Sequence, residues 1–354
     1  MKTPRIILTC VGGIFSPGMI SLLKEKAPQA VYLVGVDIHK DAVGFSFVDK
    51  AYTVPRGSSK KYFKRMFEIA IKEEIDAIIP VDDYEVLSLS EHRVTLERHG
   101  IRLACPTYWS ASKVLDTGKM LSFLRKNNKM CPDFYLPRRK REFISAVYKL
   151  GYPNKKVVVK PRISHGAVGF WILCENYDKK REFFEERIPR TISLERLLEG
   201  FTCDHDFASC VIMEYLPGKD FNVDVLANNG EVMHAVINER LIPDAGPLQK
   251  GHVYNDKLVY KKVEDVVKIF KLNSFVNVEL AYREGKEAIP LVYEINPRVS
   301  AAVVASESAG INLLWLGVQH ILGKKIPKHI PLREVKMSRY WAEAYQLGKE
   351  RFNS

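Results

Sequence analysis

The chain has 354 residues, 46% of them hydrophobic, and a formal net charge of +12. This length exceeds the size at which one hydrophobic core stops growing, so we expect two or three substructures. No apolar run approaches the roughly 18 residues of a membrane span, and Gly12 and Gly13 interrupt the N-terminal apolar stretch before it resembles a signal peptide. The sequence therefore predicts a cytoplasmic protein with no membrane association.

The basic residues and the cysteines narrow the function classes further. Lys and Arg are spread along the chain rather than gathered with aromatic residues, which favours anionic small molecules over nucleic acid as partners. The six cysteines include no Cys-x-x-Cys pair, which argues against a zinc site and against a disulfide framework. A homodimer is the default expectation for the oligomeric state.

Strand-like and helix-like segments alternate through the first hundred residues, which predicts a doubly wound α/β domain. The expected segments are 6–9, 19–26, 31–36, 62–74, 77–80 and 85–98. Gly12 and Gly13 follow the first strand, and Asp37 ends the second, where a dinucleotide-binding fold has an acid for ribose. Gly18 does not complete a Gly-x-Gly-x-x-Gly spacing, so a tight strand-to-helix turn is favoured over a dinucleotide site.

The pattern changes near residue 112, where a new lobe is expected. Residues 113–127 are predicted to form one helix, and the β-branched strand 157–161 contains Lys160 near its end. A loop with small residues, 164–169, leads into a second strand at 170–174. Glycines let backbone N–H groups approach phosphates and a lysine supplies a point charge, so this unit fits a cover over nucleotide phosphates. The alternative is an ordinary hairpin with an exposed lysine.

A further strand, 211–216, is ended by Pro217 and Gly218. Glu214 and Asp220 flank this corner, where free backbone groups could pair with an adenine edge and Asp220 could accept hydrogen bonds from ribose hydroxyls. Downstream, residues 221–226 and 232–238 surround an Asn-Asn-Gly turn, which predicts an antiparallel hairpin.

Two acids and an amide stand at the ends of two later strands. Glu279 ends the run 275–279, and the motif Glu294-Ile-Asn296-Pro-Arg298 follows the apolar run 289–293. Carboxylates and an amide oxygen at neighbouring strand ends can share one or two divalent cations with substrate phosphates, and Arg298 would meet the remaining charge. Solvated polar residues that close a hairpin are the alternative, and this stretch alone does not separate the two.

In their order along the chain, these motifs resemble the ATP-grasp superfamily, and within it the carboxylate–amine ligases that are similar to the large subunit of carbamoyl phosphate synthase. The resemblance covers nearly the whole chain, and its most specific parts are Val-Val-Lys-Pro at 158–161, Met-Glu-Tyr-Leu-Pro-Gly-Lys-Asp at 213–220, and the Glu-x-Asn-Pro-Arg motif. It implies a mixed α/β and α+β architecture, the ATP-grasp fold. The implied parts are a Rossmann-like pre-ATP-grasp domain at 1–111, a small nucleotide lobe at 112–210 and a large lobe with the metal site at 211–354.

The resemblance also implies which residues bind ATP. For the phosphates these are Lys119 and Lys160 with the loop residues Ser164, Gly166 and Gly169, and for adenine and ribose Glu214, Tyr215, Leu216 and Asp220.

The metal and catalytic residues follow from the same resemblance. Glu279, Glu294 and Asn296 would ligate two Mg²⁺ ions, with Mn²⁺ as a substitute, between the β- and γ-phosphates. Arg298 and Arg240 would stabilise the transferred phosphoryl group. The implied reaction phosphorylates a small carboxylate and couples the acyl phosphate to an amine, such as an amino acid, with release of ADP and phosphate.

Three other functions stay open at this point. The chain could be one component of a split carbamoyl phosphate synthase or carboxylase, or an ATP-binding module without turnover. A dinucleotide-dependent oxidoreductase is suggested only by Gly12, Gly13 and Asp37.

Two departures from the family pattern concern the acceptor pocket. Ala301 and Ala302 stand where the family often has two glycines, and the stretch 242–251 is less regular than the family's substrate loop. Lys250 in that stretch is a candidate substrate contact. The sequence therefore does not identify the acid or the amine.

Overall fold

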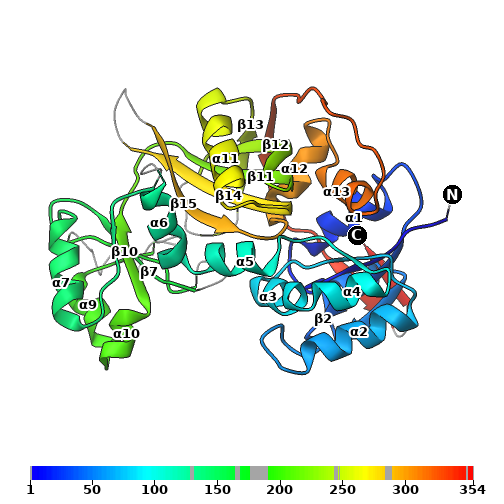
Figure 1. Ribbon diagram of the computed structural model, residues 1–354, viewed down its shortest axis with the longest axis horizontal. Coiled ribbons are helices and arrows are strands. Elements are labelled where there is room, and N and C mark those ends of the chain that lie inside the picture. The colour runs from blue at the N-terminus through cyan, green and yellow to red at the C-terminus, as the bar shows by residue number, and fades with distance from the viewer. Residues whose placement is uncertain are drawn as a thin grey trace.

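Three sheets divide the chain into three parts (Figure 1). The computed structural model describes residues 2–127, 131–163, 168–175, 190–242, 246, 248–283, 289–347 and 350–353. In the view of Figure 1, the blue N-terminal domain lies at one end, the green small lobe lies at the other, and the yellow sheet of the large lobe lies between them.

The N-terminal domain is a parallel sheet in the order β3-β2-β1-β4-β5. Ile6 and Leu8 share a core with α1 whereas Ile7 shares a core with α2, because successive side chains of a strand point to opposite faces. The predicted doubly wound domain is thereby confirmed. Its elements are β1 (Arg5–Leu8), α1 (Ser16–Lys24), β2 (Tyr32–Asp37), η1 (Val43–Ser46), β3 (Lys50–Thr53), α2 (Tyr62–Lys72), β4 (Ala77–Ile79), α3 (Asp83–Glu91), α4 (Arg93–Arg98) and β5 (Arg102–Leu103).

Two helices that the sequence predicted as continuous are broken in the structure. The predicted helix 85–98 divides at His92 into α3 and α4. The predicted helix 113–127 divides at Asp116, whose extended backbone separates α5 (Tyr108–Leu115) from α6 (Thr117–Lys126). The Asp116 carboxylate caps α6 through the Lys119 N–H and forms an ion pair with Arg162 at 2.8 Å. These two bonds hold the break, so the single-helix prediction was wrong here.

The small lobe is a five-stranded sheet in the order β6-β10-β7-β8-β9. Val157 and Val159 of β7 share a core with α7, so Val158 and Lys160 face the opposite way, toward the large lobe. The elements are β6 (Phe134–Tyr135), α7 (Lys140–Lys149), β7 (Val157–Pro161), β8 (Trp171–Leu173), β9 (Thr191–Ile192), α9 (Leu194–Glu199), α10 (Asp204–Ala208) and β10 (Cys210–Glu214).

The large lobe is an antiparallel sheet in the order β15-β14-β11-β12-β13-β16. The predicted hairpin is present, and Asn229 and Gly230 adopt the positive φ angles, 50° and 90°, that a tight hairpin turn requires. Helix α11 covers one face of the sheet with apolar side chains. The elements are β11 (Asp220–Asn228), β12 (Glu231–Arg240), β13 (Lys250–Val253), α11 (Lys257–Ile269), β14 (Ser274–Tyr282), β15 (Pro290–Asn296) and β16 (Val335–Ser338), followed by the separate hairpin of β17 (Ala344–Leu347) and β18 (Glu350–Asn353).

Three short helices after β15 join the large lobe to the N-terminal domain: η2 (Ala301–Val303), α12 (Val304–Ser308) and α13 (Leu313–Ile321). Their apolar side chains share one core with α1 and with β1, and the Asn312 side chain donates a hydrogen bond to the Leu22 carbonyl at 2.7 Å. The N-terminal domain is therefore firmly packed on the large lobe. The exact domain boundaries, after residues 111 and 210, stay predictions.

Within the described ranges, no single helix is long and apolar enough to cross a membrane. Only the bent pair Ala301–Ser308 and Leu313–Ile321, with 103° between its halves, reaches that length and composition together.

One carboxyl group of the N-terminal domain is fully enclosed. Glu85 Oε2 accepts hydrogen bonds from the Thr9 hydroxyl, from the Cys10 thiol at 3.3 Å and from the Asp82 N–H at 3.3 Å. Burial raises the pKa of Glu85 from 4.5 to about 7, although the Thr9 hydroxyl opposes the shift and the charge of Asp82 adds to it. The folded chain therefore holds a proton on Glu85 more tightly than the unfolded chain does.

We predict that Glu85 makes the fold less stable as the pH rises. The stabilisation that Glu85 gives the folded chain is complete below the pKa of this residue in the unfolded chain and is lost as the pH rises through about 7. The free energy of unfolding should decrease by about 3 kcal/mol over this range. Urea unfolding of wild type and Glu85→Gln at about pH 5 and about pH 8 measures this, and the variant should show the smaller decrease. Equal decreases in the two chains would contradict the prediction.

Candidate active site

A cavity of about 430 Å³ lies where the three parts of the chain meet. The small lobe contributes Lys160 to its wall, and residues 213–218 contribute the adjoining corner. The polar face of the large sheet supplies Glu279 and Glu294, and the N-terminal domain supplies Phe15. A ligand in this cavity would contact all three parts at once.

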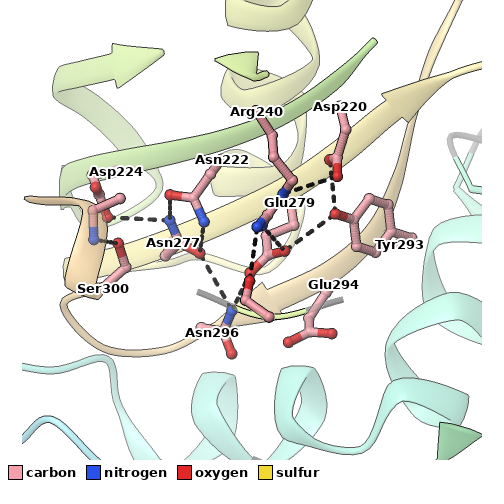
Figure 2. A network of polar contacts seen from close by, with 12 residues as sticks. Asp220, Asn222, Asp224, Arg240, Asn277, Glu279, Tyr293, Glu294, Asn296 and Ser300 are labelled. Carbon is pink, nitrogen blue, oxygen red and sulfur yellow. Dashed lines mark hydrogen bonds and ion pairs between the residues drawn. The ribbon is translucent and has the colours of Figure 1, made fainter. Parts of the chain in front are cut away.

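Polar side chains cross the large sheet in two adjacent rows. The strand register pairs Asn222 with Glu279 and Glu279 with Glu294, on β11, β14 and β15. Directly paired residues of antiparallel strands have Cβ atoms about 4.5–5.5 Å apart, so the two acids are neighbours because of register alone. In the next row the register pairs Asp224 with Asn277 and Asn277 with Asn296 (Figure 2). The structure therefore brings Glu279, Glu294 and Asn296 together, as the motif predicted.

A β-bulge adds a tyrosine to the same wall. The pairing of β14 with β15 shifts between Glu279 and Leu280, so that Tyr293 has no direct partner on β14. Consecutive residues of a regular strand point to opposite faces, but the bulge lets both Tyr293 and Glu294 line the cavity. The Tyr293 hydroxyl donates to Asp220 at 2.8 Å and contacts Glu279 at 3.1 Å (Figure 2).

An ion pair joins the small lobe to the large lobe at the cavity wall. Lys160 Nζ lies 2.6 Å from Glu294 Oε2, and the lysine side chain is only 4% exposed. Burial would raise the pKa of Glu294, but the charge and hydrogen bond of Lys160 outweigh this and hold it below its usual value. Burial and the neighbouring Glu294 charge raise the pKa of Glu279. Glu279 therefore binds a proton more tightly than Glu294 does.

Arg240 lies between two of the acids. Its Nε lies 3.1 Å from Asp220 Oδ2, its Nη2 lies 3.4 Å from Glu279 Oε2, and its Nη1 donates to the Gly246 carbonyl at 2.7 Å. Burial raises the pKa of Asp220, and Arg240 and Tyr293 oppose that rise. Arg240 therefore orients Asp220 and Glu279 and lies at the cavity wall. Its direct contact with a phosphoryl group stays a prediction.

Arg298 reaches from the motif toward the N-terminal domain. Its Nη2 donates to Asn296 Oδ1 at 3.2 Å, and its Nε lies 3.4 Å from Asp83 Oδ1 in α3. The Asn296 side chain in turn donates to Glu279 Oε1 and to Asn277 Oδ1, each at 3.3 Å. Arg298 and the predicted metal ligands thus form one hydrogen-bonded group.

The predicted nucleotide residues fall into three sets. Glu214, Tyr215, Leu216 and Asp220 line the cavity together with Lys160. Lys119 is exposed on α6 and does not line the cavity. Gly169 packs beside Pro161, and a Cβ atom added to Gly169 would lie 2.7 Å from the proline ring. Ser164 and Gly166 lie outside the described residues. The roles of all these residues stay predictions.

Glu214 is occupied by local partners. Its carboxylate accepts hydrogen bonds from Arg283 at 2.6 and 2.7 Å, and its backbone N–H donates to the Asp133 carbonyl at 2.8 Å. The predicted backbone contact to adenine would therefore have to come from the other backbone groups of this corner, such as those of Leu216.

The oxygen ligands of the predicted metal site suit magnesium. Hard divalent cations take carboxylate and amide oxygens and complete their shell with water and substrate phosphate. Glu294 is 37% exposed, so its carboxylate is reachable from the cavity, and Glu279 and Asn296 flank it. Among the described residues, no group of three or more His, Cys, Asp and Glu side chains is arranged to hold a metal ion. The candidate set consists of two carboxylates and one amide. Such a small set suits a magnesium ion whose remaining ligands are water and substrate phosphate oxygens.

Several polar residues of the site were missed by the sequence analysis. Asn222, Asp224, Asn277 and Tyr293 belong to the network in Figure 2, and Asp83 reaches it from α3. The signal for the first three was available, since polar residues recur at every second position in 220–224 and in 277–279. Nothing comparable marks Tyr293 or Asp83.

The glycine turn after β1 is closed by its own side chains. Asp37 accepts hydrogen bonds from the Gly12 N–H at 2.7 Å and from the His39 N–H at 2.9 Å. An added Cβ on Gly12 would lie 2.8 Å from the Asp37 carboxylate, so no larger residue fits. The acid that a dinucleotide site would use for ribose is thus bound within the turn, as the tight-turn interpretation predicted.

Family models match two regions of the chain. Residues 206–343 match the model described as ATP-grasp in the biosynthetic pathway with Ter operon, and residues 8–104 match the PylC-like N-terminal domain. Residues 206–343 are therefore identified as an ATP-grasp region, and residues 8–104 as a PylC-like N-terminal domain. The resemblance to the ATP-grasp superfamily is confirmed at this level, as is the predicted fold.

Solved structures with the same fold include three of particular interest. The N5-carboxyaminoimidazole synthetase of Staphylococcus aureus, complexed with ADP, has a TM-score of 0.70 and 16% identity over 96% of this chain and 83% of its own. An L-amino acid ligase of Bacillus licheniformis has a TM-score of 0.65 and 14% identity over 98% and 83%. The biotin carboxylase domain of a Hydrogenobacter thermophilus 2-oxoglutarate carboxylase, in complex with magnesium ADP, ADP and bicarbonate, has a TM-score of 0.64 and 16% identity over 92% and 71%. Among curated proteins, none matches this chain.

We predict that Lys160→Met weakens ATP binding at least about tenfold, because a buried cation next to the phosphates is lost while side-chain volume is kept. Calorimetric titration with ATP and magnesium measures the affinity. Lys64→Met, which removes an exposed lysine of α2, is the control and should bind ATP like the wild type. An unchanged affinity in Lys160→Met would contradict the phosphate role.

Proposed function

We propose that the chain is an ATP-dependent carboxylate–amine ligase. It would phosphorylate a small carboxylate to an acyl phosphate and couple this to an amine, such as an amino acid, with release of ADP and phosphate. The observation that carries the proposal is that Glu279, Glu294 and Arg298 line one cavity with Lys160, while Asn296 hydrogen-bonds Glu279 and Arg298 from behind.

The comparisons support this proposal at the level of the fold. Two of the structures that share it were solved with ADP, one of these also with magnesium and bicarbonate, and a third is an L-amino acid ligase. The residues at the cavity wall add support, because Glu279 and Glu294 with the three cations Lys160, Arg240 and Arg298 are the kinds of group that phosphoryl transfer requires. The Asn296 amide is not a lining residue and lies behind them, hydrogen-bonded to Glu279.

The chemistry needs charge neutralisation rather than a protein nucleophile. A carboxylate oxygen would attack the γ-phosphorus of ATP, and the bond from that phosphorus to the bridging oxygen would break to release ADP. The amine nitrogen would then attack the acyl carbon, phosphate would leave, and the amine would lose a proton. Phosphoryl transfer depends on positioning and on electrostatic stabilisation, which fixed cations supply in a cavity of low dielectric constant.

The chain's own residues would divide these tasks. Lys160 would hold the phosphates from the small lobe, and Arg298 would face the transferred phosphoryl group from the large lobe. Arg240 would fix the orientation of Asp220 and Glu279, with which it is already paired. Magnesium, when bound by Glu279, Glu294 and Asn296, would neutralise charge on the phosphates.

A phosphate-release screen tests the proposal. Wild-type chain with ATP and magnesium is offered pools of carboxylic acids and amines, and mass spectrometry identifies any new amide. Release that needs both an acid and an amine supports the ligase. Release with bicarbonate alone would favour a component of a split carbamoyl phosphate synthase or carboxylase, and ATP binding without release in any pool would favour a module without turnover.

We predict that Glu294→Gln lowers magnesium-dependent phosphate release at least about a hundredfold, because a charged ligand next to the phosphates becomes neutral. The rate is measured at saturating ATP with the pool that gives the highest wild-type release. Glu239→Gln is a matched control, since Glu239 lies on β12 of the same sheet but contacts Lys219 and Tyr254 outside the cavity. Unchanged release in Glu294→Gln would overturn the site assignment.

A further inference from the structure

The arginine of the Glu-x-Asn-Pro-Arg motif is held from two sides. Asn296, a predicted metal ligand, accepts from Arg298 Nη2 at 3.2 Å, and Asp83 lies 3.4 Å from Arg298 Nε. The side chains are 19% exposed for Arg298 and 8% for Asp83, so water screens this ion pair weakly. The guanidinium is planar, and partners on two of its nitrogens, Nε and Nη2, restrict its orientation as well as its position.

Asp83 is itself placed by a rigid helix start. Helix α3 begins with a capping box, in which the Asp82 side chain accepts from the Glu85 N–H and the Glu85 side chain accepts from the Asp82 N–H. The Asp82 side chain also accepts from the Tyr84 N–H. The Glu85 carboxyl is anchored in turn to Thr9 and Cys10 at the end of β1. A carboxylate in the first turn of a helix is favoured by the helix dipole, so Asp83 is a fixed negative charge.

The distance between Asp83 and Arg298 is set by packing between domains. The N-terminal domain and the helices after the motif share one hydrophobic core, in which Gly18 packs so closely on Val304 that an added Cβ would lie 2.9 Å from it. The ion pair is therefore part of a firm interface.

We propose that Asp83 of the N-terminal domain is a positioning residue for Arg298, so that this domain completes the active site rather than only supporting it. The inference rests on the proposed function. Asp83 touches neither ATP nor the carboxylate in this role; it acts by keeping the guanidinium turned toward the cavity. Without it, the guanidinium would be free to turn toward the remaining acids, Glu279 and Glu294.

The first experiment measures turnover in Asp83→Asn with the acid and amine found in the screen. We expect kcat to fall between about tenfold and a hundredfold, since small displacements of a catalytic group have effects of that size, while the KM for ATP stays unchanged. Asp83→Glu restores the charge and should recover part of the loss. Glu91→Gln removes an exposed carboxylate at the other end of α3 and should behave like the wild type.

The second experiment is a pair of double-mutant cycles with Arg298→Met, one on kcat and one on the urea midpoint of unfolding. If Asp83 acts through Arg298, its loss causes no further decrease of kcat once Arg298 is gone, and the stability cycle shows coupling as well. Coupling in stability with additive effects on kcat would mean a structural ion pair only and would overturn the proposal. Unchanged kcat in Asp83→Asn would overturn it too. Failure of the proposed function itself is seen separately, as a wild-type chain that releases no phosphate.

Discussion

The ion pair between Lys160 and Glu294 constrains the rest of the active site. A buried charge is costly unless an opposite charge and hydrogen bonds compensate it, and Lys160 is almost completely enclosed. Among the described residues, the ion-pair partner of Lys160 is Glu294, which belongs to a different sheet, so charge compensation for the buried ammonium group comes from β15 of the large lobe. The same pair leaves Glu294 ionised beside Glu279. One contact between the lobes therefore compensates the buried lysine and influences the charge state of the candidate metal site.

Much of the site could be predicted because the spacing of residues along a strand determines which side chains lie next to one another in a sheet. The sequence placed Glu279 at a strand end, whereas it lies within β14, but the antiparallel register still pairs it directly with Glu294 of the motif on the neighbouring strand β15. The hairpin turn at Asn229 and Gly230 was readable for a similar reason, since few residues tolerate its positive φ angles. The fold and the proximity of Glu279, Glu294 and Asn296 could be predicted because both depend on local pattern and on order along the chain.

What escaped prediction depends on irregularity or on contacts between distant segments. The Tyr293 hydroxyl reaches the acids only because a β-bulge turns two successive residues to the same face, and single-sequence periodicity does not reveal a bulge. Asp116 looks like an ordinary polar residue within a helix until Arg162, 46 residues later, stabilises a break there. Asp83 and Arg298 are separated by more than two hundred residues, and no spacing rule connects them.

The polar row of the large sheet and the cavity wall beyond the motif are linked through the chain that follows Arg298. Ser300 caps η2 by accepting a hydrogen bond from the Ala302 N–H. It also contacts Asp224 in the polar row. Burial raises the pKa of Asp224 to about 6, and hydrogen bonds from Ser300 and Asn277 oppose this rise. Ala301 and Ala302 line the cavity together with Phe15 and Met19 of the N-terminal domain. They begin the helix that Ser300 caps, and this helix shares a core with α1, so the wall next to the polar row is fixed both by hydrogen bonding and by apolar packing. Under the proposed function, the change from the family's two glycines to these alanines would therefore alter the shape of a wall that is fixed in place.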